Sequence, residues 1–226
     1  MTSETATVAS IRIQDVVWRA DLTVNGQPYP MHYKFPDRYR GRRLGARALF
    51  TADGLTERQY TEMVAAHELG HAVLWLAAGL HVTGIAISGT GRGAGHTRAR
   101  RTGIADEALW LLLGAVAGEV AQGRWLREVG LWTEDRAVLV EATAVSDRQA
   151  VLRTAVPAPR FGTVAGAGGL GQDYVHLQSR ADQELERLWL QLTRALPHLI
   201  QQQVLTSREL ADHLGLPLNA PSDADR

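Results

Sequence analysis

Apolar residues recur at helical spacing over most of the chain beyond residue 55. The pattern predicts helices over residues 61–80, 106–126, 133–147, 173–203 and 206–214. Thr56, with Gln59 three residues later, is typical of a capping box at the start of the first helix. Pro197 is expected to bend or break the fourth helix, because proline has no backbone N–H to donate. The expected fold is therefore mainly α.

Strands are expected at two places. Residues 8–24 are rich in β-branched side chains, and Asn25-Gly26 supplies a hairpin turn before a returning strand at residues 29–35. A further short strand is predicted at residues 81–88, with a flexible glycine-rich loop after it at residues 89–95. The fold class is thus α+β with a helical majority, a small N-terminal β appendage and a short β edge strand.

Shifts in composition divide the chain into three parts. We expect residues 1–54 to form the β-hairpin appendage and an arginine-rich linker, residues 55–215 to form one helical domain, and residues 216–226 to form a disordered tail. Residues 157–171, rich in glycine, proline and alanine, are expected to be mobile.

The formal net charge is zero, which predicts no general attraction to nucleic acid or membranes. Arginine and aromatic residues interleave at residues 33–47, a pattern that can bind single-stranded nucleic acid, but a solvated linker is the preferred interpretation. The chain has no cysteine, which excludes thiolate zinc sites and fits a reducing compartment. No secretory signal precedes the domain, and the longest apolar run, residues 108–118, is shorter than the roughly 20 residues that span a bilayer. A cytoplasmic protein without a membrane span is expected.

The candidate chemistry lies in the first predicted helix, at residues 67–71, His-Glu-Leu-Gly-His. Side chains four apart lie on one helical face, so His67 and His71 can bind one metal ion. Glu68 lies beside them and can hold a proton for a metal-bound water. A core helix gains nothing from a glutamate between two histidines, so a purely structural histidine pair is the less favoured interpretation.

A catalytic zinc needs three protein ligands and an open position for water. Leu74 and Ala77 occupy the places where a metzincin carries a glycine and a third histidine, which excludes that class. Glu119 and the pair Glu134-Asp135 remain as candidates for the third ligand.

Several motifs, in order, resemble the peptidase domain of the FtsH-type, AAA-linked membrane proteases. Residues 66–73, Ala-His-Glu-Leu-Gly-His-Ala-Val, are similar to the family's HEAGHA core, and residues 113–120 resemble its LGGRAAEEL helix without the arginine and the first glutamate. Ile85, Ala86 and Ile87 look like its edge strand. Residues 133–135 with residues 141–143 are similar to its "NDL…AT" segment, although Arg136 replaces the usual leucine.

The resemblance implies a zincin-type, mostly helical zinc endopeptidase. Asp135 matches the aspartate that is the family's third zinc ligand, so zinc would be bound by His67, His71 and Asp135, with Glu68 as the general base. The strand of Ile85, Ala86 and Ile87 would pair with extended segments of protein or peptide substrates. The family's ATPase module and membrane anchor have no counterpart in residues 1–54, so unfolding of substrates would need an unfoldase partner in trans.

Two other function classes stay open at this point. A regulatory, repressor-cleaving protease shares the same metal-helix core and would use Glu119 as its third ligand. Without that role, Glu119 is a polar residue that closes the apolar helix, beside a ligand histidine. A non-catalytic binding module stabilised by zinc would tolerate the loss of Glu68. A homo-oligomer is compatible with either.

Overall fold

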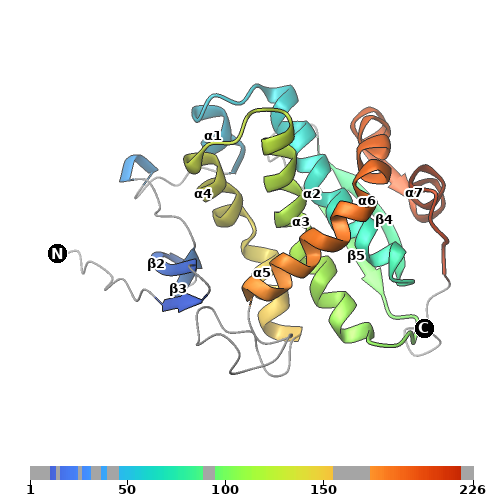
Figure 1. Ribbon diagram of the computed structural model, residues 1–226. Coiled ribbons are helices and arrows are strands. Elements are labelled where there is room, and N and C mark those ends of the chain that lie inside the picture. The colour runs from blue at the N-terminus through green and yellow to red at the C-terminus, as the bar shows by residue number, and fades with distance from the viewer. Residues whose placement is uncertain are drawn as a thin grey trace.

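The computed structural model of the protein describes residues 11–13, 16–24, 27–31, 37–39, 46–88, 95–154 and 174–219 (Figure 1). Helices dominate these segments, which confirms the mainly α prediction. The helices are α1 (Ala46–Ala52), α2 (Glu57–Ala77), α3 (Glu107–Glu128), α4 (Glu134–Thr143), α5 (Val145–Thr154), α6 (Tyr174–Gln202) and α7 (Ser207–Leu214), with a short 3₁₀ turn at Asp37–Tyr39.

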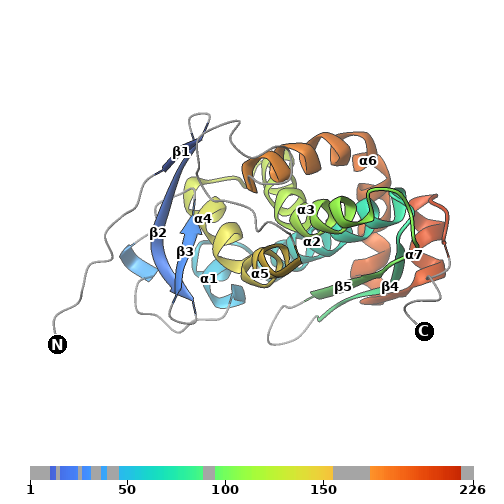
Figure 2. The ribbon, with the colours of Figure 1, turned by 90° about the horizontal axis from the view of Figure 1, so that it is seen from below.

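Two small antiparallel sheets lie at opposite ends of the helical body (Figure 2). The first has the order β1-β2-β3, with strands Ile11–Ile13, Val16–Val24 and Gln27–Met31. Its β2–β3 pairing is the hairpin predicted around Asn25-Gly26. The second sheet has the order β5-β4-β6, with strands Gly95–Arg100, His81–Ile87 and Val204–Thr206.

Helix α2 is the centre of the core. Residues 63–76 are buried on nearly every side, as expected of a helix surrounded by other elements rather than lying on a surface. Helices α3 and α6 and the sheet of β4 and β5 pack around it (Figures 1 and 2). The predicted capping box begins α2: the Thr56 side chain accepts from the Gln59 N–H, and the Gln59 side chain accepts from the Thr56 N–H.

Glycines let α3 approach α2 closely. A methyl group on Gly70 would lie 2.6 Å from the Ala117 carbonyl oxygen of α3. A methyl group on Gly114 would lie 2.0 Å from the Trp75 indole nitrogen of α2. Neither distance is tolerable between non-bonded atoms, so these positions set the spacing of the two helices.

Two sequence predictions about helices were wrong. Residues 133–147 do not form one helix: α4 ends at Thr143 and α5 begins at Val145. Part of the predicted linker, Ala46–Ala52, is helix α1. Pro197, which was expected to bend or break its helix, lies inside α6 and does not break it, because buried residues such as Leu192 and Leu199 anchor the helix on both sides of the proline.

The edge-strand prediction was also wrong. Ile85, Ala86 and Ile87 belong to β4, which pairs with β5 on one side, while Ile85 and Ala86 also pair with β6 on the other. The edges of this sheet are β5 and the short β6, and β5, which includes Arg98 and Arg100, was not predicted as a strand. The half-buried face of β5 carries only the small residues Gly95, Thr97 and Ala99, and the exposed face carries His96, Arg98 and Arg100. Without large apolar residues at alternate positions, the sequence gives no clear signal of a strand.

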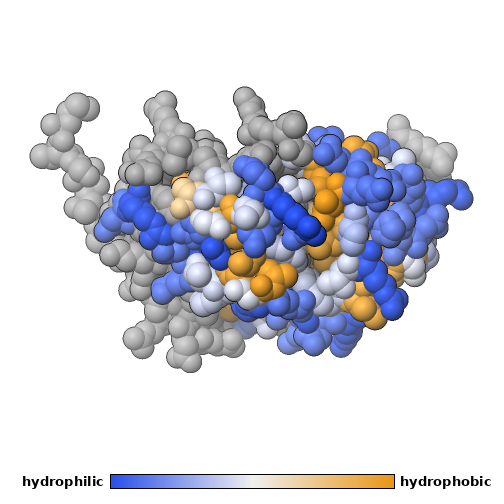
Figure 3. All heavy atoms as spheres, turned by 90° about the horizontal axis from the view of Figure 1, so that it is seen from above, coloured by the Kyte–Doolittle hydropathy of each residue, from blue (hydrophilic) through white to orange (hydrophobic). Residues whose placement is uncertain are grey.

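Hydrophilic side chains cover much of one face of the molecule, with apolar residues in smaller patches between them (Figure 3). None of the helices in the described segments is long and apolar enough to cross a membrane. The predicted mobile segment at residues 157–171 and residues 220–226 of the predicted tail lie outside the described residues. Asn219, at the start of that tail, donates from its side chain to the Gly79 carbonyl oxygen at 2.9 Å.

Replacing Gly70 by alanine should lower the free energy of unfolding by about 1–3 kcal/mol, because the added methyl group must push α3 away from α2. Gly123→Ala is the matched control within α3. Its added methyl group would come no closer than 3.9 Å to another side chain, and alanine favours the helix, so stability should rise by about 0.5–1 kcal/mol. Urea unfolding of both variants measures the two changes, and equal effects would contradict the close-packing argument.

Candidate metal centre

His67 and His71 lie one helical turn apart on α2 and turn their imidazoles toward one another. Their Nε2 atoms are 3.1 Å apart, and the rings meet edge to face at 4.7 Å between centroids. Trp75, one further turn along α2, stacks on His71 at 5.4 Å and holds that ring from its other side. The helix therefore supplies a paired, orientated set of nitrogen ligands.

Both histidines are fixed in the same tautomer by acceptors on α3. The Nδ1–H of His67 donates to Gln122 Oε1 at 3.0 Å, and the Nδ1–H of His71 donates to the Gly114 carbonyl oxygen at 2.7 Å. An imidazole that donates from Nδ1 keeps a lone pair on Nε2. Metal-binding histidines are commonly held in this way by a partner on the other nitrogen. The two Nε2 lone pairs are therefore presented together.

Asp147 completes the group from α5. Its carboxylate lies 3.1 Å from His67 Nε2 and 3.7 Å from His71 Nε2. Zinc bound tetrahedrally at about 2.0–2.1 Å holds neighbouring ligand atoms roughly 3.3–3.4 Å apart. The three groups thus have the spacing that one ion requires, and they could hold a metal ion.

The charges at this centre favour a cation. Burial, the largest single influence, lowers the pKa of His67, but the hydrogen bond and charge of Asp147, with Glu68 and Gln122, together raise it to about 9. Burial raises the pKa of Asp147, but the charges of His71 and His67 outweigh it and leave that pKa below its ordinary value. His67 is therefore protonated at neutral pH in the absence of a metal ion, and a metal ion would have to displace this proton in order to bind.

Glu68 is placed beside this group by β5. Its side chain is buried, and its Oε2 accepts a hydrogen bond from the Thr97 hydroxyl at 2.7 Å. Gly95 lies so close that a methyl group there would be 2.3 Å from Glu68 Cγ. Gly95 and Thr97 of β5 both contact the Glu68 side chain, and together they hold its carboxylate in one defined position.

A cavity of about 590 Å³ opens over His67, Glu68, His71 and Asp147. Its walls come from α2, β5, α3 and α5. A volume of this size admits a short stretch of peptide as well as water. The metal-binding group and the glutamate therefore face a shared space that a substrate could enter.

Gly118 explains how α3 fits beneath the metal group. A methyl group at this position would lie 2.4 Å from His71 Nε2 and 2.8 Å from His67 Nε2. Any larger residue would occupy the space next to the ligand atoms. Gly114 and Gly118 thus both permit the close packing of α3 on α2, and Gly118 also keeps the ligand nitrogens clear.

Asp135, the predicted third ligand, does not join the histidines. Its carboxylate forms an ion pair with Arg38, whose guanidinium also bonds Asp53 at 2.8 Å. The Asp135 side chain is 40% exposed and lies in the first turn of α4. The prediction of Asp135 is thus corrected to Asp147, since only Asp147 joins the two histidines in a metal-competent group of the described residues.

The misplaced helix boundary explains this error. With residues 133–147 taken as one helix, Asp147 stands at a C-terminus, where a carboxylate is unfavourable. In the structure the Thr143 hydroxyl donates back to Leu139 O at 2.9 Å and α4 stops. Asp147 then lies in the first turn of α5, where the helix dipole favours a carboxylate. The resemblance selects Asp135 at the start of the predicted helix, and no signal in the sequence marks Asp147 at its predicted end.

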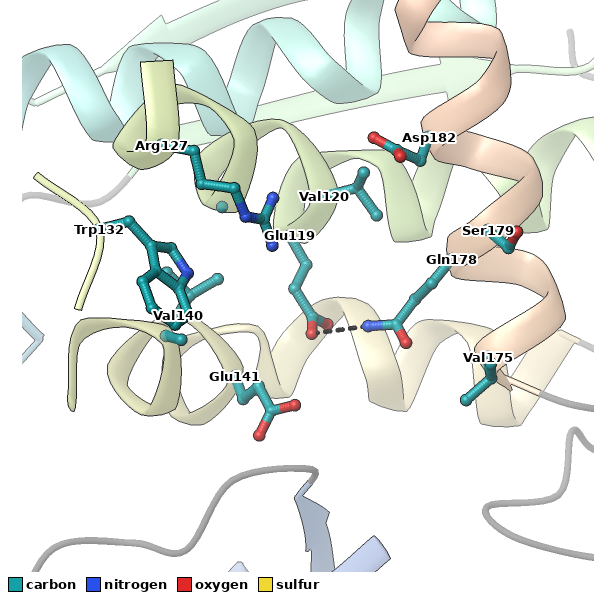
Figure 4. Close-up of a pocket in the computed structure, with 12 residues that line it drawn as sticks. Glu119, Val120, Arg127, Trp132, Val140, Glu141, Val175, Gln178, Ser179 and Asp182 are labelled. Carbon is teal, nitrogen blue, oxygen red and sulfur yellow. Dashed lines mark hydrogen bonds between the residues drawn. The ribbon is translucent and has the colours of Figure 1, made fainter. Parts of the chain in front are cut away.

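Glu119, the alternative ligand, is not part of the metal group, and its carboxylate points toward Gln178 of α6 (Figure 4). Its carboxylate accepts hydrogen bonds from Arg148 Nε at 3.0 Å, the Tyr174 hydroxyl at 2.9 Å and Gln178 Nε2 at 3.0 Å. With these partners it does not act as a metal ligand. It lines a separate pocket of about 310 Å³, together with Trp132 and other residues of α3, α4 and α6.

Arg148 links this buried cluster to the metal centre. Its side chain is fully buried, it bonds Glu119 through two nitrogens, and it lies 3.6 Å from Glu141 of α4. Because Arg148 follows Asp147 directly, the ion pair with α3 holds the first turn of α5 where the Asp147 carboxylate meets α2. This arginine could not be recognised from the sequence, where it is one of many charged residues in a helical segment.

No family model matches the chain, and the comparison with curated proteins gives no match either.

Removing the Arg148 guanidinium should destabilise the protein strongly. Arg148→Met leaves the Glu119 and Glu141 carboxylates buried without their cation, and loss of one partner of a buried ion pair typically costs about 3–5 kcal/mol. Arg58→Met is the control, because the Arg58–Glu62 pair is exposed and its loss should not change the unfolding midpoint measurably. Chemical denaturation of both variants compares them, and a small effect of Arg148→Met would show that the pair does not anchor α5.

Proposed function

We propose that the protein is a zinc-dependent endopeptidase. His67, His71 and Asp147 would hold the zinc ion, and Glu68 would be the general base. The observation that carries the proposal is the convergence of three ligand atoms, two of them with fixed lone pairs, beside a buried glutamate that faces the same cavity. Structural zinc sites have no use for such a glutamate or for an adjoining cavity.

The donor set favours zinc over magnesium and calcium. Two imidazole nitrogens and one carboxylate suit zinc, whereas magnesium and calcium prefer oxygen ligands alone. Three protein ligands also leave one tetrahedral position for water or substrate. The cavity over the group provides the space for that position.

The chain's own residues would carry out the proton transfers. Bound zinc supplies a water of lowered pKa and an electrophile for the substrate carbonyl oxygen. Glu68 takes the proton of the attacking water and returns it to the leaving amine. Thr97 keeps one Glu68 oxygen occupied, so that the other oxygen is free for this transfer. Gln122 and Gly114 hold the two histidines in the tautomer that binds metal.

The edge strand β5 is the better candidate for substrate alignment, in place of β4. It pairs with β4 on one side only among the described strands, and Gly95, His96 and Thr97 line the cavity. An extended peptide could add to this edge and cross the metal centre. Such binding would favour unfolded segments, which is why an unfoldase in trans is part of the proposal for folded substrates.

The resemblance to FtsH-type peptidase domains supports the same proposal, with Asp147 instead of Asp135 as the third ligand. A cytoplasmic location and ATP-independent cleavage by the isolated chain belong to it as well. The repressor-cleaving alternative with Glu119 as ligand loses its basis, because that carboxylate is bonded to Arg148, Tyr174 and Gln178.

The wild-type protein is expected to retain about one zinc ion per chain after dialysis, and Asp147→Asn should weaken zinc binding at least about 10-fold. Asp135→Asn is the matched control: it removes the same charge from an exposed ion pair and should keep the wild-type affinity. Competition with a chromophoric chelator measures both affinities. A metal-free, folded wild-type protein, or loss of zinc in Asp135→Asn alone, would overturn the assignment.

Glu68→Gln should abolish hydrolysis of an unfolded, casein-like substrate, with a fall in kcat of at least about 100-fold, while zinc content stays at the wild-type level. The amide preserves the size of the side chain and its contact with Thr97 but cannot accept the proton. Fluorescence release from labelled casein gives the rate, and elemental analysis gives the metal content. Wild-type activity in this variant would leave the metal with a structural role only.

A further inference from the structure

The rim of the metal cavity carries cationic side chains. Arg98 of β5 and Arg153 of α5 both line the cavity, and both are exposed. Within the described part of the chain neither guanidinium forms an ion pair or a hydrogen bond to a protein acceptor. The neighbouring Arg101, in contrast, is paired with Glu107 at 3.7 Å. Two unneutralised positive charges therefore lie on facing walls of one cavity.

The arginines of β5 are arranged in a row by the alternation of side chains along the strand. Along β5, Gly95, Thr97 and Ala99 are half-buried, whereas His96, Arg98 and Arg100 are exposed. Alternate residues of a strand share a face, so the second set forms a row on the outer face of β5. A peptide that pairs with this edge would place its own alternate side chains about 4.5–5.5 Å from that row.

The acidic residues of the cavity do not cancel this charge when metal is bound. Glu68 and Asp147 are the carboxylates among the cavity-lining residues, and both belong to the metal centre. A divalent ion balances these two carboxylates, which leaves the sign of the cavity to Arg98 and Arg153. Positive clefts with apolar walls concentrate anionic ligands.

We propose that the cavity selects acidic peptide segments, with aspartate or glutamate side chains placed alternately along β5 and opposite Arg153. The proposal rests on the proposed peptidase function and adds its substrate class. Arg98 and Arg153 are then specificity-determining residues, and Glu68 and the metal ligands are not involved in the choice.

Edge strands often carry charges that prevent pairing with other chains, and Arg98 and Arg100 would serve that purpose equally well. Arg153 separates the two explanations. It lies on helix α5, across the cavity from β5, where protection of a strand edge needs no charge. Its presence on the facing wall is what a binding site for anionic side chains requires.

The test uses the zinc-loaded, full-length protein and three quenched-fluorescence peptides of one length. They share a central sequence and differ only in flanking residues, which are glutamate, glutamine or lysine. The wild-type kcat/KM should follow the order glutamate, glutamine, lysine, and the preference should shrink between about 0.05 and about 0.5 M salt as the charges are screened. Each arginine should contribute about two- to fivefold to the glutamate-to-glutamine ratio.

Arg98→Glu and Arg153→Glu should each lower that ratio, and the double variant should reverse the preference toward lysine. Arg194→Glu is the control, because Arg194 is an exposed arginine of α6 outside the cavity and should leave the ratio unchanged. An unchanged ratio in the double variant, or an equal change in the control, would overturn the inference while leaving the peptidase intact.

Failure of the proposed function gives a different result, in which none of the peptides is cleaved. The preference is then measured by fluorescence anisotropy, as binding of the three labelled peptides to zinc-loaded Glu68→Gln protein. Tighter binding of the glutamate peptide, lost in the double arginine variant, supports the acidic selectivity. Equal binding of all three peptides overturns it.

Discussion

The close contact between α2 and α3 is the constraint on which the metal centre depends. Gly70, Gly114 and Gly118 remove the side chains that would separate the helices, and α3 then reaches the histidines with its own acceptors. A bulkier residue at Gly118 would enter the space of the ligand nitrogens. The tautomers of the two histidines therefore depend on the packing of α3 against α2. If the helices moved apart, the histidines would lose the α3 acceptors that fix them.

The position of α5, which carries Asp147, depends on a buried ion pair. The buried Arg148–Glu119 pair fixes α5 to α3, and Asp147 is carried into place as the neighbour of Arg148. A buried ion pair adds little net stability compared with apolar packing, but a broken one is costly. The pair thus acts mainly on geometry: few other positions of α5 would satisfy both the carboxylate of Glu119 and the histidines of α2.

Features that depend on a local residue pattern could be predicted from the sequence. Features that depend on contacts between residues far apart in the chain could not. The apolar period and the capping box located α2, and the spacing of His67 and His71 identified two ligands with the glutamate between them. The third candidate ligand depended on where one helix stops and the next begins, and the apolar pattern of residues 133–147 does not mark the break between Thr143 and Val145. Strand β5 alternates small residues with charged or polar ones, and Arg148 is one charged residue among many, so large apolar side chains mark neither of them. Both are defined by partners elsewhere in the chain.

The division of the metal group between α2 and α5 has a consequence for the unfolded chain. His67 and Asp147 are on the order of 80 residues apart in sequence, and an ion held by both closes that whole stretch into a loop. Such a clip removes conformations from the unfolded ensemble, much as a disulfide of similar span does. In a chain without cysteine, such an ion would act as a crosslink in place of a disulfide, and the helices between its two ends would be confined along with the site itself.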